Sequence, residues 1–588
     1  MLQLPPEVLH LVATFLEQST LSALLQVCRH FRVVFQPRLY QSVTIDNCTL
    51  QQWRSLISAP ITNDSLSRTQ KFSIEFLPDL SDSSKPMPIL DVLITILKAM
   101  PNLRSFTACY FLVGLMQTPG SLDTTTVCDQ LMELLNLEDL CLYCDSNWIH
   151  KFKWRLPPFT NLKSLALHRL DERPYGDISD VAEILLASPK LKSLGLSCRY
   201  EAGLDNDLLF GIIRYYHEKS VERGLLCTLQ LRQLHLGIGT MPWEHPSCPD
   251  DHDYLSRLTN LDFLETLRLD NMHLHLDGID VAVPFVPIVP ELFSRAVRLK
   301  CIIVERFGPD ILSLVRIVHE AQMSQSSHTS LSSLQVLEYG ESLHFEGDEP
   351  ESGGINGYSG DPIFSVPLSE AGYSWRRLCY SGFPYNRDPQ RAAYSLDLLR
   401  FVAKCSELEE LMIPIHNRAE MEFLKMQVLP KLPHLRLLHL PWGNLGKGFL
   451  SELECPRPNP YHFRRFSEEE KAETIQKNKD IDRELEKQRL GIVHDLFECH
   501  LGLRSELPHM APLAHVAINT DVYARVFIPP MTGDRDNREA EISSSVGTRD
   551  TDPYLLSDGS KIVRLPREEA RTLGIVEILL MKDILWIS

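Results

Sequence analysis

The chain contains 588 residues, with 44% hydrophobic residues and a formal net charge of −18. This length exceeds what one compact core usually organises, so we expect several domains or an elongated repeat array. The negative charge argues against general binding to nucleic acid or to an anionic membrane, because both require a basic surface. No stretch approaches 18 consecutive apolar residues, so no transmembrane helix is predicted and we expect a cytoplasmic or nuclear protein.

The first segment, LPPEVLHLVATFLEQSTLSALLQVCRHF (residues 4–31), predicts two short amphipathic helices. Pro5 and Pro6 suit the first turn of a helix, where a backbone amide has no intrahelical partner. Apolar residues then recur at helical spacing in both halves, and Ser19 or Thr20 can cap the second helix. Helices this short need another surface for their apolar faces, which is either the rest of this chain or a partner.

The order of residues in this segment resembles the F-box motif without a gap. The matching positions are Leu4, Pro5, Glu7, Val8, Leu9, Val12, Leu16, Leu21, Leu24, Val27, Cys28, Arg29 and Phe31. The segment departs from the motif at Thr20, where Asp is common, and at Phe31, where Trp is more common. The resemblance implies that residues 1–45 are an F-box that binds a Skp-type adaptor, and through it the cullin and RING subunits of a ubiquitin ligase. The residues implied to form or support the adaptor interface are Leu4, Pro5, Val8, Leu9, Val12, Leu16, Leu24 and Phe31.

After a strand-like run at residues 42–45, the phrase L-x-x-L-x-L recurs along the chain, mostly within residues 46–442. The copies are NLRSFTACY (102–110), NLEDLCLYC (136–144), NLKSLALHR (161–169), KLKSLGLSC (190–198), QLRQLHLGI (230–238), FLETLRLDN (263–271), RLKCIIVER (298–306), SLQVLEYGE (333–341), WRRLCYSG (375–382), ELEELMIPI (407–415), HLRLLHLPW (434–442) and PLAHVAINT (512–520). Self-similarity at such intervals indicates a solenoid. Segments such as 91–103 and 179–191 place apolar residues at helical spacing before the next copy.

L-x-x-L-x-L is the strand half of a leucine-rich repeat. The irregular spacing and the absence of an Asn ladder resemble the degenerate repeats of F-box/leucine-rich-repeat proteins, many of them fungal. The resemblance implies an α/β fold in which a helical F-box precedes an irregular leucine-rich-repeat solenoid, a horseshoe with parallel strands inside and helices outside. We assign residues 46–442 to these repeats.

Strand alternation predicts that the residues between the leucines line the concave face of this solenoid. That face is a hypothetical binding site for an unknown protein substrate, although solvated strand residues without a ligand would give the same pattern. The candidate substrate-binding residues are Tyr143, His168, His235, Arg268, Asp270, Glu305, Glu338, Arg377 and His439. The same alternation places Asp139, Ser164, Gln233 and Glu410 on this face.

Several segments interrupt the repeats towards the C-terminus. We predict an acidic, Gly-rich loop at 341–362, a charged and partly helical insertion at 443–510, a last repeat-like strand within 511–528, a disordered segment at 529–560 and a capping segment at 561–588. Within the insertion, residues 467–489 predict a solvated helix, and Ser467 with Glu470 fits a capping box.

Catalytic and metal-binding motifs are missing from the sequence. It contains no G-x-x-x-x-G-K-[ST], G-x-G-x-x-G, H-E-x-x-H or G-x-S-x-G pattern. The pair Cys141 and Cys144 belongs to a predicted strand that points the two side chains to opposite faces, and His245, Cys248 and His252 have no common ligand spacing. We therefore expect a non-catalytic protein without a metal or cofactor.

The expected function is that of the substrate-recognition subunit of an SCF-type ubiquitin ligase. Two alternatives stay open at this point. The chain could bind the adaptor as a scaffold or regulator without assembling a ligase, or the repeats could form a receptor for a small molecule.

Overall fold

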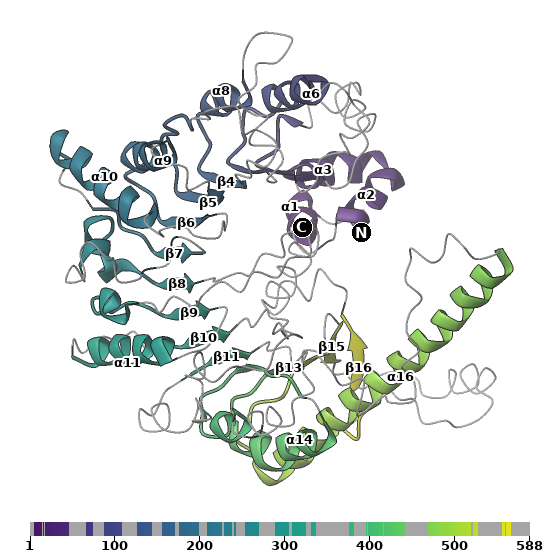
Figure 1. Ribbon diagram of the computed structural model, residues 1–588. Coiled ribbons are helices and arrows are strands. Elements are labelled where there is room, and N and C mark those ends of the chain that lie inside the picture. Colours follow the sequence, from purple (N-terminus) through teal and green to yellow (C-terminus); the bar gives the residue numbers. More distant parts are fainter. Residues whose placement is uncertain are drawn as a thin grey trace. The chain divides into compact units, whose positions relative to one another are not determined.

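The computed structural model falls into two compact units, Met1–Leu331 and Ser332–Ser588, and each is described by itself (Figure 1). The described residues are 5–13, 16, 18–45, 66–74, 87–108, 126–143, 156–170, 176–198, 208–225, 228–237, 240, 242, 253–269, 289–304, 309–324, 331–336, 375–380, 396, 398–415, 417–440, 468–518, 521–526, 555–558 and 560–565.

The first unit begins with a small helical cluster. Its helices are α1 (Pro6–Ala13), α2 (Gln18–Val27) and α3 (Arg29–Leu39). Cys28 caps α3, since its Sγ accepts a hydrogen bond from the backbone N–H of Phe31 at 3.4 Å. The buried residues of the cluster are Leu9, Ala13, Leu21, Phe31, Val34 and Phe35. The Phe31 and Phe35 rings pack with centroids 5.3 Å apart, so a phenylalanine fills the position where the F-box motif more often has tryptophan.

A parallel sheet follows the helical cluster, and its strand order is the chain order. The strands of the first unit are β1 (Ser42–Ile45), β2 (Lys71–Ile74), β3 (Ser105–Ala108), β4 (Asp139–Tyr143), β5 (Ser164–Leu170), β6 (Ser193–Cys198), β7 (Gln233–Leu236), β8 (Thr266–Leu269) and β9 (Cys301–Val304). The register pairs the corresponding residues of successive copies, as at Leu140 with Leu165 and Leu165 with Leu194.

The recurring leucines explain this register. In each copy of the first unit, the first apolar residue is buried in the turn before the strand, and the second and third are buried on one face of the sheet, as for Leu162, Leu165 and Leu167. The backbone repeats with them. The carbonyl oxygen of Glu138 accepts the N–H groups of Lys163 and Ser164 at 2.7 and 3.0 Å, and equivalent pairs recur along the sheet. Each copy is thereby fixed against the next by both packing and hydrogen bonds.

Helices and helical turns connect the strands of the first unit, and the helices lie on one side of the sheet (Figure 1). They are α6 (Met87–Lys98), α8 (Val127–Met132), α9 (Gly176–Ala187), α10 (Leu208–Glu222), η1 (Tyr254–Arg257), η2 (Leu261–Phe263), η3 (Pro290–Phe293) and α11 (Pro309–Ser324).

All twelve copies of the recurring phrase contain an observed strand. Strand β2 lies outside these copies, because Thr69 stands where the first leucine of a copy would be. Thr69 is fully buried and its hydroxyl donates to the carbonyl oxygen of Tyr40 at 2.9 Å. A hydrogen bond to the end of α3 replaces the apolar packing of a leucine at this position.

The second unit begins with further parallel strands and ends with antiparallel strands. Its strands are β10 (Ser333–Val336), β11 (Arg377–Tyr380), β12 (Glu410–Met412), β13 (Leu437–Leu440), β14 (His515–Ile518), β15 (Asp521–Val526) and β16 (Lys561–Arg564). Strands β10 to β14 are parallel, whereas β15 pairs antiparallel with both β14 and β16. The helical elements are α14 (Arg418–Phe423), the π-helical turn η4 (Leu424–Val428), η5 (Leu429–Lys431) and α16 (Glu468–Glu506). The fold is therefore mixed α/β with open, mostly parallel sheet.

Helix α16 extends well beyond the solvated helix expected at residues 467–489. Its second half buries Leu490, Val493, Leu496 and Phe497 in the second unit. The sequence interpretation of 443–510 as an insertion thus differs from the structure over this part, which is core. The physical reason is the spacing of these four residues, which lines them along one face of the helix.

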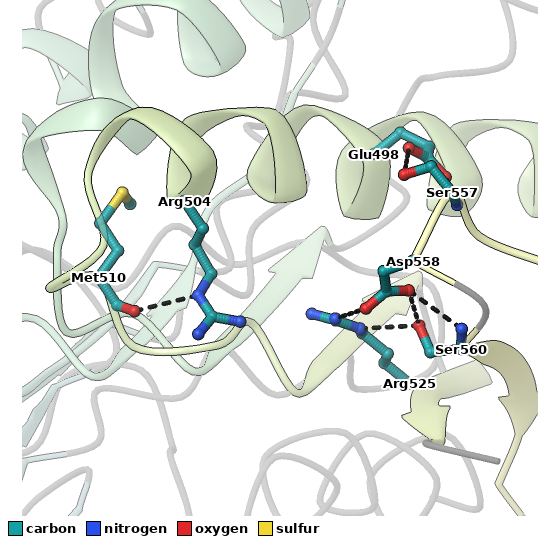
Figure 2. Close-up of polar contacts among 7 residues, drawn as sticks. All are labelled: Glu498, Arg504, Met510, Arg525, Ser557, Asp558 and Ser560. Atoms are coloured by element: carbon teal, nitrogen blue, oxygen red, sulfur yellow. Dashed lines mark hydrogen bonds and ion pairs between the residues drawn. The ribbon is translucent and has the colours of Figure 1, made fainter. Parts of the chain in front are cut away.

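The C-terminal part of the second unit is held by charged and polar contacts (Figure 2). Glu498 of α16 accepts hydrogen bonds from the backbone N–H and the hydroxyl of Ser557 at 2.6 and 2.7 Å. Arg525 of β15 forms an ion pair with Asp558, and its Nε donates to Ser560 at 2.9 Å. The disorder expected for 529–560 is therefore wrong at 555–558 and 560, while 529–554 lie outside the described residues. The capping role of 561–588 stays a prediction, of which the described part is β16.

Candidate functional site

The open face of the sheet in the first unit brings together three of the candidate substrate-binding residues. The rings of Tyr143 and His168 lie 4.8 Å apart, and those of His168 and His235 lie 5.5 Å apart. His168 Nδ1 also lies 3.2 Å from the hydroxyl oxygen of Ser197. Strands β4, β5 and β7 therefore present a row of tilted rings that can donate and accept hydrogen bonds.

Small residues lie beside this row. A side chain built at Gly195 would place its Cβ 3.3 Å from that of Ala166 and 3.7 Å from His235 Nδ1. The absence of a side chain at Gly195 therefore lets Ala166 and His235 pack closely against β6. Arg268 extends the row, because its strand register pairs it directly with His235.

The remaining candidate substrate-binding residues have different outcomes. Arg377 is ion-paired with Glu410, with Nη2 at 2.9 Å from Oε1, in the second unit. His439 is fully buried, so the expectation of a surface position is wrong there. All four residues of β13 are buried, which means that both faces of this strand are covered. Asp270, Glu305 and Glu338 lie outside the described residues.

The candidate adaptor-binding residues divide into core and surface. Leu9 and Phe31 belong to the buried core of the helical cluster, so they can only support an interface. Pro5 and Val8 are exposed, Val8 by 39%, and can touch a partner. Val12, Leu16 and Leu24 are half-buried, and Leu4 lies outside the described residues.

Three further apolar side chains of the helical cluster are largely exposed. They are Leu11 (61%), Val27 (67%) and Val33 (66%). Val8 and Leu11 are three residues apart on α1 and therefore share a face. Val27 belongs to the recognised motif, whereas Leu11 and Val33 carry no motif signal and become candidates only through their exposure. The cluster thus presents apolar surface that a partner could cover.

The helical cluster is fixed to the sheet at the end of α3. The carbonyl oxygen of Gln41 accepts the N–H groups of Gln70 and Lys71 at 2.9 and 3.0 Å, which is the same pattern that joins later copies. The side-chain amide of Gln41 also donates to Gln70 Oε1 at 3.1 Å. The helices and the first strands therefore form one continuous body within this unit.

Comparison with known proteins agrees with this anatomy at the N-terminus. The family described as F-box-like matches residues 1–46. Residues 1–46 form an F-box-like domain. No curated protein matches the chain. F-box-like domains are typical of protein-interaction adaptors, and they typically bind Skp-type adaptor proteins.

Three cysteine thiols outside the F-box-like domain are affected by burial. Burial raises the pKa of the Cys128, Cys141 and Cys405 thiols to about 12, which keeps them protonated and poorly nucleophilic near neutral pH. Among the residues that the structure describes, no group of three or more His, Cys, Asp and Glu side chains is arranged to hold a metal ion. Within the same residues, none of the helices is both apolar and long enough to cross a membrane.

Proposed function

We propose that this protein is a substrate-recognition subunit of an SCF-type ubiquitin ligase. The F-box-like domain binds a Skp-type adaptor, which bridges to the cullin and RING subunits, and the sheet that follows holds a target protein. The observation that carries the proposal is the match at residues 1–46 together with exposed apolar side chains on the same helices. The chain itself contributes position, since tethering makes transfer to the target effectively intramolecular.

The adaptor interface in this proposal uses the residues implied by the motif and those found by exposure. Pro5, Val8 and Leu11 contact the adaptor, with Leu4 preceding them. Val12, Leu16 and Leu24 flank the contact, while Leu9 and Phe31 keep the helices in place from the core.

The regions after the F-box-like domain are, in this proposal, leucine-rich repeats that form a solenoid. Support comes from the buried leucines in register and from the coincidence of strands with the recurring phrase. The open face of β4 to β8 is the proposed target-binding surface, centred on Tyr143, His168, His235 and Arg268. The row of rings suits a target that supplies aromatic or hydrogen-bonding side chains.

The adaptor step can be tested with the full chain co-expressed with a Skp-type adaptor. A variant carrying Val8→Glu and Leu11→Glu places two charges on the exposed face of α1. We expect the affinity for the adaptor, measured by calorimetry or by titrated pull-down, to fall at least roughly tenfold, because anchors at an interface often contribute about 2 kcal/mol or more each.

The matched control carries Val221→Glu and Met323→Glu. These residues are also exposed apolar side chains on helices of the first unit, 54% and 71% exposed, but lie outside the F-box-like domain. The control should bind the adaptor normally. Unchanged binding by the α1 variant, or an equal loss in the control, would contradict the proposed interface. Capture of the adaptor without the cullin would favour a scaffold over a ligase receptor.

A further inference from the structure

A cavity of about 540 Å³ lies where the F-box-like domain meets the turns before β2, β3 and β4. Its lining comes from α1, from the end of α3 and from the residues just ahead of the strands. The lining residues are His10, Pro37, Arg38, Gln41, Arg68, Gln70, Asn102, Arg104 and Asn136. All except the proline are basic or carry an amide, and none is acidic.

The arginines of this cavity have no ion-pair partner within the described part of the chain. Arg68 and Arg104 form no ion pair there. The next carboxylate along the sheet edge, Glu138, accepts a hydrogen bond from Lys163 Nζ at 2.7 Å, and this bond lowers the pKa of Glu138. Arg104 also contributes to that lowering at longer range. A concentration of positive charge in a chain whose net charge is −18 indicates a local preference for anions.

Hydrogen bonds orient the amides of the cavity. Arg38 donates to Gln41 Oε1, and Gln41 Nε2 donates to Gln70 Oε1 at 3.1 Å. The Gln70 side chain therefore has its acceptor occupied, and its amide nitrogen has no partner among the described residues. Arginine forks and amide N–H groups together are the donor set that phosphate oxygens prefer.

The repeat geometry explains why these side chains gather. Gln41, Gln70 and Arg104 each immediately precede a strand, and their carbonyl oxygens form the backbone ladder of the sheet. Arg68, Asn102 and Asn136 lie two residues ahead of the corresponding positions in their own copies. Neighbouring strands are about 4.8 Å apart, so each set forms a row of closely spaced side chains. The F-box-like helices close the end of both rows with His10 and Arg38.

We propose that this cavity binds a small polyanion that carries more than one phosphate group. The volume is that of a site for a small molecule, within the usual range of about 300–1,000 Å³. Three arginines can each engage a different phosphate oxygen, which favours several phosphates over a single carboxylate. The site goes beyond the proposed ligase function, since neither adaptor nor target binding requires it.

Calorimetric titration of the full chain with sodium tripolyphosphate, at low and at physiological ionic strength, tests the proposal. We expect one molecule bound per chain. The variant Arg68→Gln with Arg104→Gln should bind at least roughly tenfold more weakly, because a hydrogen bond to a charged group is worth about 1.5–3 kcal/mol. Both arginines are exposed, so the melting temperature should not change.

The control variant carries Lys190→Gln with Lys192→Gln, which removes the same number of charges from the same edge outside the cavity. It should bind tripolyphosphate within about threefold of the unmodified chain. No binding by the unmodified chain, or an equal loss in this control, would overturn the proposal. Binding of a phosphoserine peptide but not of tripolyphosphate would also overturn it, in favour of a phosphorylated protein ligand. Adaptor binding by the arginine variant, measured in parallel, keeps this outcome separate from the ligase proposal.

Discussion

At the scale of single residues, His500 of α16 is a buried titratable side chain in the second unit. It is 1% exposed, and neither ring nitrogen has a hydrogen-bond partner among the described residues. Burial, with a smaller contribution from the positive charges of Arg504 and Arg525, lowers the pKa of His500 from 6.5 to about 4. A neutral imidazole is accommodated there, whereas an imidazolium is not.

Stability of the second unit should therefore fall in mild acid. The imidazole takes up a proton near pH 6.5 in the unfolded chain but only near pH 4 in the folded chain. The free energy of unfolding therefore falls by up to about 3 kcal/mol as the pH decreases through this window. The variant His500→Leu should remove this part of the pH dependence and raise the melting temperature at pH 5 most. Thermal unfolding curves at pH 5 and pH 7.5 measure this change in melting temperature. His434→Leu, at an exposed site of the same unit, is the control, and an identical pH profile for the His500 variant and the unmodified chain would refute the assignment.

The sequence predicts the burial of some residues but not of others. The recurring leucines are buried, as the pattern predicts, and the rings of Tyr143, His168 and His235 lie side by side in the structure. Alternation says which face of a strand a residue occupies but not what covers that face, which is why His439 was wrongly expected at the surface. The cavity at Arg68 and Arg104 carries no sequence motif, because its rows arise only when separate copies stack.

At the scale of elements, α16 combines a charged first part with a second part whose apolar side chains are buried in the core. The run of Glu and Lys after residue 467 correctly predicts a helix, yet it gives no reason to extend that helix to Glu506. The core part begins where Leu490 and Val493 pack, and Glu486 marks the transition. Its carboxylate accepts from the Tyr523 hydroxyl at 3.2 Å and lies 3.4 Å from Arg564 Nη1.

Removing the first part of α16 should therefore have little effect on stability, whereas truncating its core should have a large one. We expect a deletion of residues 468–483 to leave the melting temperature nearly unchanged. Leu496→Ala, at a fully buried site, should lower the free energy of unfolding by about 2–5 kcal/mol. Differential scanning calorimetry compares the two. A deletion as damaging as Leu496→Ala would mean that the charged half packs against the protein.

At the scale of the whole molecule, the chain is built from contacts between successive copies. Within each unit the strand order follows directly from this, since each strand pairs with the one before it. The sequence predicted that part of the architecture because the leucine pattern repeats. It did not predict the antiparallel pairing of β15 and β16, whose residues lack the recurring phrase and are held instead by the contacts of Arg525, Glu498 and Glu486.

Contacts between neighbours imply that damage to one copy stays local. Leu194→Ala in β6 removes a fully buried side chain that lies between Leu165 and Leu234 in the register, at a cost of about 2–5 kcal/mol. Hydrogen exchange followed by mass spectrometry should show faster exchange in β5, β6 and β7 and unchanged exchange in β13. Leu438→Ala, at an equally buried site of β13, should give the reverse pattern. Faster exchange throughout both units in either variant would mean that the chain unfolds as one cooperative body, which the division into two compact units argues against.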